Sequence, residues 1–360
     1  MLAVYVSGHG YGHSTRTAEV LKQIRARDPR LRIVVVASTP ARLFHQAAGA
    51  DLLVRAERVD VGLVQRGALV IDVEGTLAAW EDFQRDREAR VAREAAWLRE
   101  SGARLVLADI PPLAFAAAAA AGVPAVGLSN FSWDWIYRHL ARDAPGLARA
   151  ADAAARDYAS AALLLELPFA GDLAAFARRE PIPLVARRAS LTREEGRRRL
   201  GLGSAPAVLV SFGGLGMEDV DLSVLAPLRD VQFLTEPTGR PAPPNVRVIA
   251  PEELAALGMG YVDLVASADV VVTKPGYGIV SEAISARTRM VYTERGDFPE
   301  YPILVKGMSR WLPAVHVSNE QLRAGDLRDA LERVLALPMP EPPDLRGADV
   351  AAERLLALAG

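Results

Sequence analysis

The chain has 360 residues, of which 51% are hydrophobic and 24% are charged, and its formal net charge at pH 7 is -2. This length is sufficient for two domains with separate hydrophobic cores, and the balanced charge gives no reason to expect nucleic acid as a partner. The absence of cysteine excludes disulfides, thiolate chemistry and cysteine-based metal sites. The sequence begins directly with an expected strand, Leu2–Val6, without the basic and apolar regions of a signal peptide.

The longest apolar stretch, residues 110–128, is interrupted by prolines and glycines and contains many alanines. A buried helix followed by a buried strand fits this pattern better than a membrane span. We therefore expect no integral membrane segment, and a cytoplasmic location as the default.

The first half of the chain alternates short apolar strands with amphipathic helices, the pattern of a parallel sheet covered on both faces. We expect a helix at residues 15–27 and one long helix marked by apolar residues from Leu77 to Leu98. The expected strands are residues 2–6, 33–36, 105–108, 125–128 and 162–165.

The composition becomes polar and rich in arginine at residues 187–205, where a short helix is expected to end at Gly201. We place a domain boundary there, with a first domain at residues 1–186 and a second at residues 187–345. A last helix, within residues 346–360, is expected at residues 349–358. The strands expected in the second half are residues 208–211, 232–234, 246–249, 269–273 and 290–293.

The segment at residues 269–284 predicts a strand, a glycine-rich turn and the start of a helix. Backbone N–H groups and the positive end of a helix dipole meet at such a turn, and Gly276 and Gly278 leave room for an anion. Glu282 follows in the first turns of the helix, where its carboxylate can accept hydrogen bonds from a ribose. The segment therefore predicts a site for a nucleoside diphosphate.

Further groups of the second half are expected at the same ligand. Gly213 and Gly214 belong to another glycine-rich turn after a strand and offer backbone donors to a diphosphate. Leu254 follows a later strand, where main-chain groups can bind a base edge. Ligands of parallel α/β domains bind at the carboxyl ends of the strands, so we expect the turns of the two halves to face each other across a cleft.

Residues 7–14 join the first strand to the first helix. His13 stands where a dinucleotide-binding motif requires glycine, which argues against a nicotinamide or flavin enzyme. A histidine at a helix start is suited to proton transfer as a general base; the alternative is that His13 caps the helix or packs at the domain edge. His9 is expected at the acceptor site or as a loop-shaping residue. Asp109 ends a strand and either orients a histidine or serves as a turn or cap residue.

Two other segments carry groups that can bind sugars. Asn130 and Asp134 lie in a stretch that mixes aromatic with hydrogen-bonding side chains, for which core packing is the alternative. Asp297 and Glu300 follow a strand of the second half and either bind sugar hydroxyls or form an exposed acidic loop.

Three segments together resemble the GT-B glycosyltransferases: SGHGYGH at residues 7–13, NFSWD at residues 130–134, and KPGYGIVSE at residues 274–282, with Asp297 and Glu300 downstream. Within that superfamily the chain is similar to the peptidoglycan N-acetylglucosaminyltransferases, and more closely to the glycosyltransferase-like N-terminal domain of L-arabinokinases and bacterial relatives. The resemblance covers most of the chain. It implies a GT-B fold, with two Rossmann-like parallel-sheet α/β domains facing an interdomain cleft and a last helix that packs back on the first domain.

The resemblance also implies roles for individual residues. In such families the second domain binds a UDP-sugar and a glutamate, here Glu282, holds the ribose. His13 matches a histidine near the reaction centre, and Asp109 is its expected partner. The remaining nucleotide-sugar contacts are expected from Gly213, Gly214, Leu254, Lys274, Gly276, Tyr277, Gly278 and Ser281, and contacts to the donor sugar or acceptor from His9, Gly12, Asn130, Asp134, Asp297 and Glu300.

Lys274 departs from the pattern, because many UDP-sugar enzymes have a small or polar residue at its position. Its ammonium group either adds charge at the diphosphate or lies on the outer side of the loop. The arabinokinases also carry a kinase domain, which we do not expect in this sequence.

The expected function is transfer of a sugar from a UDP-sugar to an unidentified small-molecule or lipid-linked acceptor, with inversion and without a metal or another cofactor. Two alternatives remain from the sequence. One is a nucleotide-sugar epimerase on the same fold, and the other is a non-catalytic nucleotide-sugar-binding regulatory protein.

Overall fold

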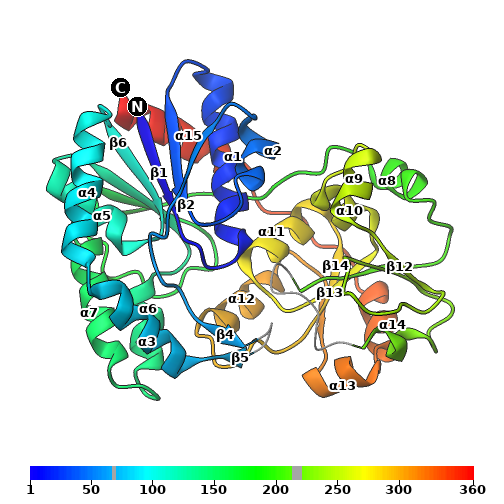
Figure 1. Ribbon diagram of the computed structural model, residues 1–360. Helices are drawn as coiled ribbons and strands as arrows, with labels where there is room; N and C mark the ends of the chain where they lie inside the picture. The colour runs from blue at the N-terminus through cyan, green and yellow to red at the C-terminus, as the bar shows by residue number, and fades with distance from the viewer. Residues whose placement is uncertain (67–69, 213–220) are drawn as a thin grey trace.

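The computed structural model describes residues 1–66, 70–212 and 221–360, which form two parallel α/β domains side by side (Figure 1). The first domain contains a seven-stranded parallel sheet in the order β3-β2-β1-β6-β7-β8-β9. Its strands are β1 (Leu2–Val6), β2 (Ile33–Ala37), β3 (Leu53–Ala56), β6 (Leu105–Asp109), β7 (Ala125–Ser129), β8 (Leu163–Glu166) and β9 (Arg179–Pro181).

Alternate residues of β1 show how this sheet is covered on both faces. Leu2, Val4 and Val6 belong to a buried apolar cluster shared with helices of one face, whereas Ala3 and Tyr5 belong to the cluster of the other face. Because both faces are buried, the strand is apolar throughout. The helices of this domain are α1 (Tyr11–Arg27), α2 (Arg42–Ala48), α3 (Val73–Gln84), α4 (Arg87–Glu100), α5 (Pro112–Ala121), α6 (Trp133–Leu140) and α7 (Leu147–Tyr158), and a small antiparallel pair is formed by β4 (Gln65–Arg66) and β5 (Val70–Ile71).

The second domain contains a six-stranded parallel sheet in the order β12-β11-β10-β13-β14-β15. Its strands are β10 (Ala207–Val210), β11 (Gln232–Thr235), β12 (Val246–Val248), β13 (Val270–Thr273), β14 (Arg289–Tyr292) and β15 (Ala314–His316). Its helices are α8 (Arg193–Arg199), the 3₁₀ helix η2 (Leu222–Leu225), α9 (Pro251–Ala256), α10 (Tyr261–Ser267), α11 (Tyr277–Ala286), α12 (Glu300–Met308), α13 (Asn319–Ala324) and α14 (Arg328–Ala336).

The chain crosses between the domains twice, and the last helix, α15 (Gly347–Ala359), returns to pack on α1 of the first domain (Figure 1). The two crossing segments are bonded to each other. Leu184 N–H donates to the carbonyl of Asp344 at 3.1 Å, and Gly347 N–H donates to the carbonyl of Leu184 at 3.3 Å. A Cβ atom on Gly347 would lie 2.2 Å from the Pro183 carbonyl oxygen, so only glycine permits this approach.

The expectation of two parallel-sheet α/β domains is confirmed. The expectation of one long helix across residues 77–98 is wrong, because α3 ends at Gln84 and α4 begins at Arg87. A polar run at residues 84–88 separates the apolar residues of the two helices, so each helix has its own apolar stripe. The first helix also begins at Tyr11 rather than near residue 15. In the described part of the chain, no helix is long and apolar enough to cross a membrane.

Candidate functional site

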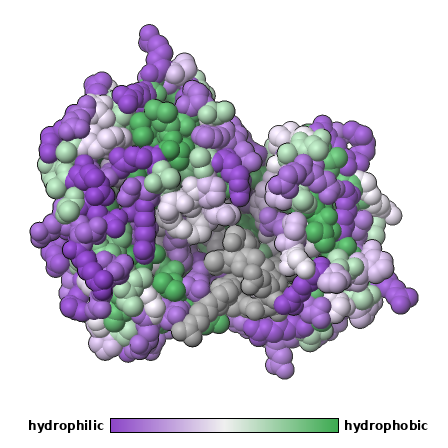
Figure 2. Space-filling model, in the orientation of Figure 1, coloured by the Kyte–Doolittle hydropathy of each residue, from purple (hydrophilic) through white to green (hydrophobic). Residues whose placement is uncertain are grey.

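The N-termini of one helix from each domain meet at the interface between the domains. Helix α1 begins after Gly10, whose φ of 76° favours glycine, and α11 begins after Gly276. The Cα atom of Gly12 lies 3.5 Å from the position that a Cβ atom on Gly278 would occupy. Since both helix dipoles present their positive ends here, the junction favours an anionic ligand. On the face shown in Figure 2, a groove separates the two domains.

His13 lies in the first turn of α1 and contacts Asp109 at the end of β6. Its Nδ1 is 2.7 Å from Asp109 Oδ1, and both side chains are buried. Burial by itself would raise the pKa of Asp109, but the neighbouring Arg16 and His13 hold that pKa at about 2. The ionised carboxylate is a suitable acceptor for an Nδ1–H of His13, and in that tautomer of the neutral ring Nε2 is the acceptor.

Arg16 is a buried member of this cluster that the sequence analysis missed. Its Nε and Nη2 donate to the two oxygens of Asp109 at 2.7 and 2.5 Å, and its Nη1 donates to Asn130 Oδ1 at 2.9 Å. The guanidinium carbon also lies 5.1 Å from the centre of the Tyr277 ring of the second domain. Arg16 follows His13 by three residues, so helical spacing alone would have placed both on one face of the helix.

His9 lies in the turn before α1 and is a hydrogen-bond donor rather than a base. Its Nδ1 accepts a hydrogen bond from the backbone N–H of Leu63 at 3.3 Å, so the proton of the neutral ring is on Nε2. Burial, followed by the charges of His13, Arg295 and Lys274, lowers the pKa of His9 to about 3. The ring therefore stays neutral at physiological pH.

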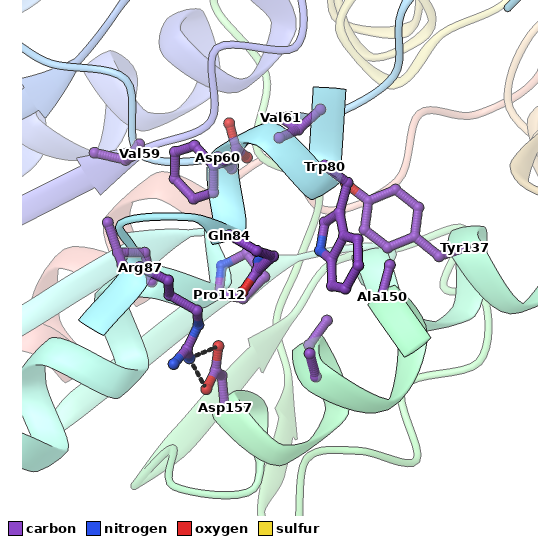
Figure 3. A pocket seen from close by; sticks show the side chains of 14 residues that line it. Val59, Asp60, Val61, Trp80, Gln84, Arg87, Pro112, Tyr137, Ala150 and Asp157 are labelled. Atoms are coloured by element: carbon purple, nitrogen blue, oxygen red, sulfur yellow. Dashed lines mark hydrogen bonds and ion pairs between the residues drawn. The ribbon is translucent and has the colours of Figure 1, made fainter. Parts of the chain in front are cut away.

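Asp60 supports the same turn and was also missed by the sequence analysis. Its carboxylate accepts hydrogen bonds from Gly8 N–H at 3.3 Å and from Trp133 Nε1 at 3.1 Å, and burial raises its pKa. Asp60 also lines a pocket of about 30 Å³ between α3, α5, α6 and α7, beside the Arg87–Asp157 ion pair (Figure 3). That volume holds about one water molecule, so the pocket is too small for a sugar.

In the second domain, Glu282 is buried in α11 and is bound by Arg187 from the crossing segment. Arg187 Nε donates to Glu282 Oε1 at 2.7 Å, and Nη2 donates to the same oxygen. Within the described residues, Oε2 of Glu282 has no hydrogen-bond partner. Tyr277 accepts a hydrogen bond from the N–H of Val185 at 3.2 Å, and Ser281 donates to the carbonyl of Gly278 at 2.8 Å.

The structure places Leu254, expected to offer main-chain groups to a base edge, within a helix. Leu254 lies inside α9, where its N–H donates to the Ala250 carbonyl at 3.1 Å and its carbonyl accepts from Met259 N–H at 2.9 Å. Both groups are therefore engaged in local structure. Gly213 and Gly214 lie outside the described residues.

Lys274 and Arg295 bring two positive charges to the N-terminus of α11. Arg295 Nη1 donates to the Pro275 carbonyl at 3.3 Å and to Glu300 Oε2 at 2.6 Å. Burial, and to a lesser extent the charge of Arg295, lower the pKa of Lys274 to about 8. Arg295 is a further residue that the sequence analysis did not name. Its only signal in the sequence was its place two residues before Asp297.

The two acidic residues expected at the donor sugar form contacts between the domains. Glu300 accepts a hydrogen bond from Asn130 Nδ2 at 2.6 Å, so each of its oxygens has a protein partner. Asp297 is exposed and pairs with His139 at 2.8 Å and Arg142 at 2.7 Å on α6 and the residues after it. Contact of either carboxylate with sugar hydroxyls stays a prediction.

Asp134 lies in the first turn of α6, and no hydrogen bond in the described part of the chain joins it to another predicted site residue. Among the described residues, its Oδ1 is buried without a hydrogen-bond partner, and burial raises the pKa of Asp134. Apart from residues 67–69 and 213–220, which are not described, no cluster of three or more histidine or acidic residues is placed to hold a metal.

Comparison with known proteins places these features on a known fold. No family model matches the chain. It is 30% identical over 365 residues to the L-arabinokinase of Arabidopsis thaliana, and the alignment covers 99% of this chain and 34% of that protein. The chain thus spans about a third of the length of this curated relative.

Solved glycosyltransferase structures match along almost the whole chain. UGT89C1 of Arabidopsis thaliana complexed with UDP superimposes with a TM-score of 0.62 at 11% identity, covering 99% of this chain and 94% of that chain. The calicheamicin glycosyltransferase CalG4 superimposes with a TM-score of 0.60 at 18% identity, covering 100% and 95%. The protein has the GT-B fold. In this GT-B chain the clustered polar residues lie where the two domains meet.

The GT-B architecture explains why residues so distant in sequence form one site. His13 and Asp109 come from the first sheet and its first helix, whereas Arg295 and Glu300 follow β14 of the second sheet. Chemically, the site combines a histidine paired with a carboxylate, a second, neutral imidazole, the cations Arg16, Lys274 and Arg295, and two helix N-termini. This combination is suited to removing a proton from a neutral group while stabilising an anion.

Proposed function

We propose that the protein is a glycosyltransferase that moves a sugar from a UDP-sugar to an acceptor hydroxyl, with inversion and without a metal. The observation that carries this proposal is the position of the His13–Asp109 pair of the first domain beside the N-terminus of α11 in the second. A base and an anion-binding helix terminus on opposite walls are what an in-line displacement requires. The GT-B fold, shared with glycosyltransferases, supports the same reaction class.

In the proposed reaction, an acceptor oxygen attacks the anomeric carbon of the donor sugar. The acceptor proton moves to Nε2 of His13 as the new carbon–oxygen bond forms. The bond between the anomeric carbon and the β-phosphate oxygen breaks, and its electron pair stays on that oxygen. Attack from the face opposite the leaving group inverts the anomeric configuration.

A nucleoside diphosphate is the donor group that the second domain fits best. Oε2 of Glu282 can accept a hydrogen bond from a ribose hydroxyl, while Lys274, Arg295 and the N-terminus of α11 supply positive charge for the phosphates. Uracil as the base is supported by the UDP complex of UGT89C1. Because the positive charge comes from side chains and backbone, the proposal needs no metal ion.

The first test is calorimetric titration of the protein with UDP, dTDP, ADP and GDP, in the presence of EDTA. The proposal expects UDP to bind in EDTA. A UDP-sugar that binds is then incubated alone and with candidate acceptors. Acceptor-dependent release of UDP supports transfer, whereas epimerisation without an acceptor, or binding without turnover, would replace it by one of the alternative functions. Binding of none of the diphosphates would overturn the donor assignment.

A further inference from the structure

A chain of buried hydrogen bonds joins the two domains across the site. Asp109 accepts from Arg16, Arg16 donates to Asn130 at 2.9 Å, and Asn130 donates to Glu300 at 2.6 Å. Glu300 in turn accepts from Arg295 at 2.6 Å. Asn130 and Glu300 are 0% and 2% exposed, so water does not compete for the bond that crosses the domain boundary.

Arg295, at the end of this chain, lies beside the start of α11. Its Nη1 is 3.8 Å from the position that a Cβ atom on Gly276 would occupy, and it is 3.3 Å from the Pro275 carbonyl oxygen. The guanidinium also stacks on Phe298, with 4.2 Å between its carbon and the ring centre. These contacts hold the cation in one orientation next to the first free N–H groups of the helix.

Arg295 keeps hydrogen-bonding capacity for a ligand. Among the described residues, only its Nη1 donates hydrogen bonds to protein atoms, which leaves the donors on Nη2 and Nε. Its charge already acts on the neighbouring groups, because it contributes to the lowered pKa values of Lys274 and His9. A diphosphate at the N-terminus of α11 would therefore lie within reach of a fixed guanidinium.

We propose that Arg295 binds the β-phosphate of the donor and stabilises the departing nucleoside diphosphate. Glu300 is then a positioning residue that orients the guanidinium of Arg295. This inference rests on the proposed function. As the bond between the anomeric carbon and the β-phosphate oxygen breaks, one negative charge develops on that oxygen. A cation fixed beforehand stabilises this charge without reorganisation, so it acts more strongly on the transition state than on the bound donor.

Glu300 is suited to positioning because both of its oxygens are held. Asn130 binds Oε1 from the first domain, which directs Oε2 to Arg295 in the second. The carboxylate that the sequence suggested for sugar hydroxyls thereby acts on the leaving group through another side chain. The orientation of the Arg295 guanidinium therefore depends on contact between the domains.

The test compares UDP with uridine, because the two ligands differ only in the diphosphate. Calorimetry is run on the wild-type chain and on Arg295→Met, Arg295→Lys and Glu300→Gln. We expect Arg295→Met to weaken UDP binding about 10- to 100-fold and to leave uridine binding unchanged. Arg295→Lys should restore part of the loss, and Glu300→Gln should weaken UDP binding less than Arg295→Met does. The matched control is Arg142→Met. It removes an exposed arginine of the first domain that pairs with Asp297, which lies on the same loop as Arg295.

Each result bears on one assignment. Equal losses for UDP and uridine in Arg295→Met would indicate a structural role and overturn the inference, as would unchanged UDP binding. A loss of the same size in Arg142→Met would show that any weakening of the domain contact suffices, and would also overturn it. If the wild-type chain binds neither UDP nor the other diphosphates, the donor assignment itself is wrong.

Discussion

Arg16 and His13 both contact the carboxylate of Asp109, and Arg16 Nη2 lies 3.1 Å from His13 Nδ1. The guanidinium donates to both carboxylate oxygens, at 2.7 and 2.5 Å, and His13 Nδ1 lies 2.7 Å from Oδ1. Since Arg16 balances the charge of Asp109, the carboxylate chiefly fixes the orientation of the imidazole. Two neighbours therefore set the orientation of the proposed base.

Breaking this buried pair should destabilise the first domain. Arg16→Met leaves Asp109 as an uncompensated buried charge, and we expect it to lower the free energy of unfolding by about 3–5 kcal/mol. The single variant Asp109→Asn should also lower the free energy of unfolding. The double variant, with both substitutions, should lose much less unfolding free energy than the sum of the two single losses. Urea unfolding of all four proteins measures this coupling, and additive losses would contradict the pairing.

Replacing the proposed base should separate chemistry from binding. His13→Gln keeps a polar side chain but removes the proton acceptor, so we expect transfer to slow by about 10²- to 10⁴-fold. UDP affinity should stay within a factor of about 2, because the variant leaves α11 untouched. The control is His316→Gln, an exposed histidine in β15. Undiminished turnover in His13→Gln would exclude it as the base.

The ribose assignment of Glu282 predicts a difference between two related ligands. If Oε2 binds a ribose hydroxyl, the wild-type chain should bind UDP more tightly than dUDP, which lacks the 2′-hydroxyl. Glu282→Gln should weaken UDP binding about tenfold and reduce the preference over dUDP. Exposed Glu252→Gln on α9 is the control. Equal affinities of the wild-type chain for UDP and dUDP would place the 2′-hydroxyl away from Glu282.

The lowered pKa of Lys274 predicts how UDP binding depends on pH. The lysine is charged below about pH 8 and loses its proton as the pH rises through that value, so its attraction for the diphosphate is present below pH 8 and declines above it. We expect UDP affinity to fall between pH 7.5 and 9.5 as Lys274 loses its charge, which calorimetric titrations at several pH values in this range measure. The Lys274→Met variant should bind UDP more weakly than the wild-type chain at pH 7.5, and its UDP affinity should be nearly independent of pH over this range. A pH dependence that survives in Lys274→Met would assign it to another group.

The sequence predicted the central strands well because burial on both faces makes them continuously apolar, as in β1 and β13. The strands β3, β9 and β15 were missed, since they are short strands at the sheet edges and carry exposed residues such as Leu53. The motif around Gly276 was local and could be recognised. The bond between Asn130 and Glu300 joins residues 170 positions apart, and no periodicity or motif encodes such a contact.

The same limit explains the acidic residues that were assigned to the sugar. Their place after β14 correctly put Asp297 and Glu300 near the domain interface, but strand order alone does not say which groups face them. Only the folded chain shows that Asn130, Arg142 and Arg295 donate hydrogen bonds to the carboxylate oxygens of these two residues. A carboxylate's availability to a ligand is decided by tertiary partners.

The hydrogen bonds between Arg187 and Glu282 connect the segment that joins the domains to the proposed nucleotide site. Arg187 belongs to the segment that connects the domains, and Tyr277, at the start of the same helix, accepts from Val185 in that segment. Arg187 holds Oε1 of this carboxylate, and the proposed ribose contact uses Oε2 of the same group. The helix proposed to bind the nucleotide is thus tied at two points to the segment that joins the domains, so a nucleotide whose affinity depends on these contacts would be thermodynamically linked to the arrangement of the domains.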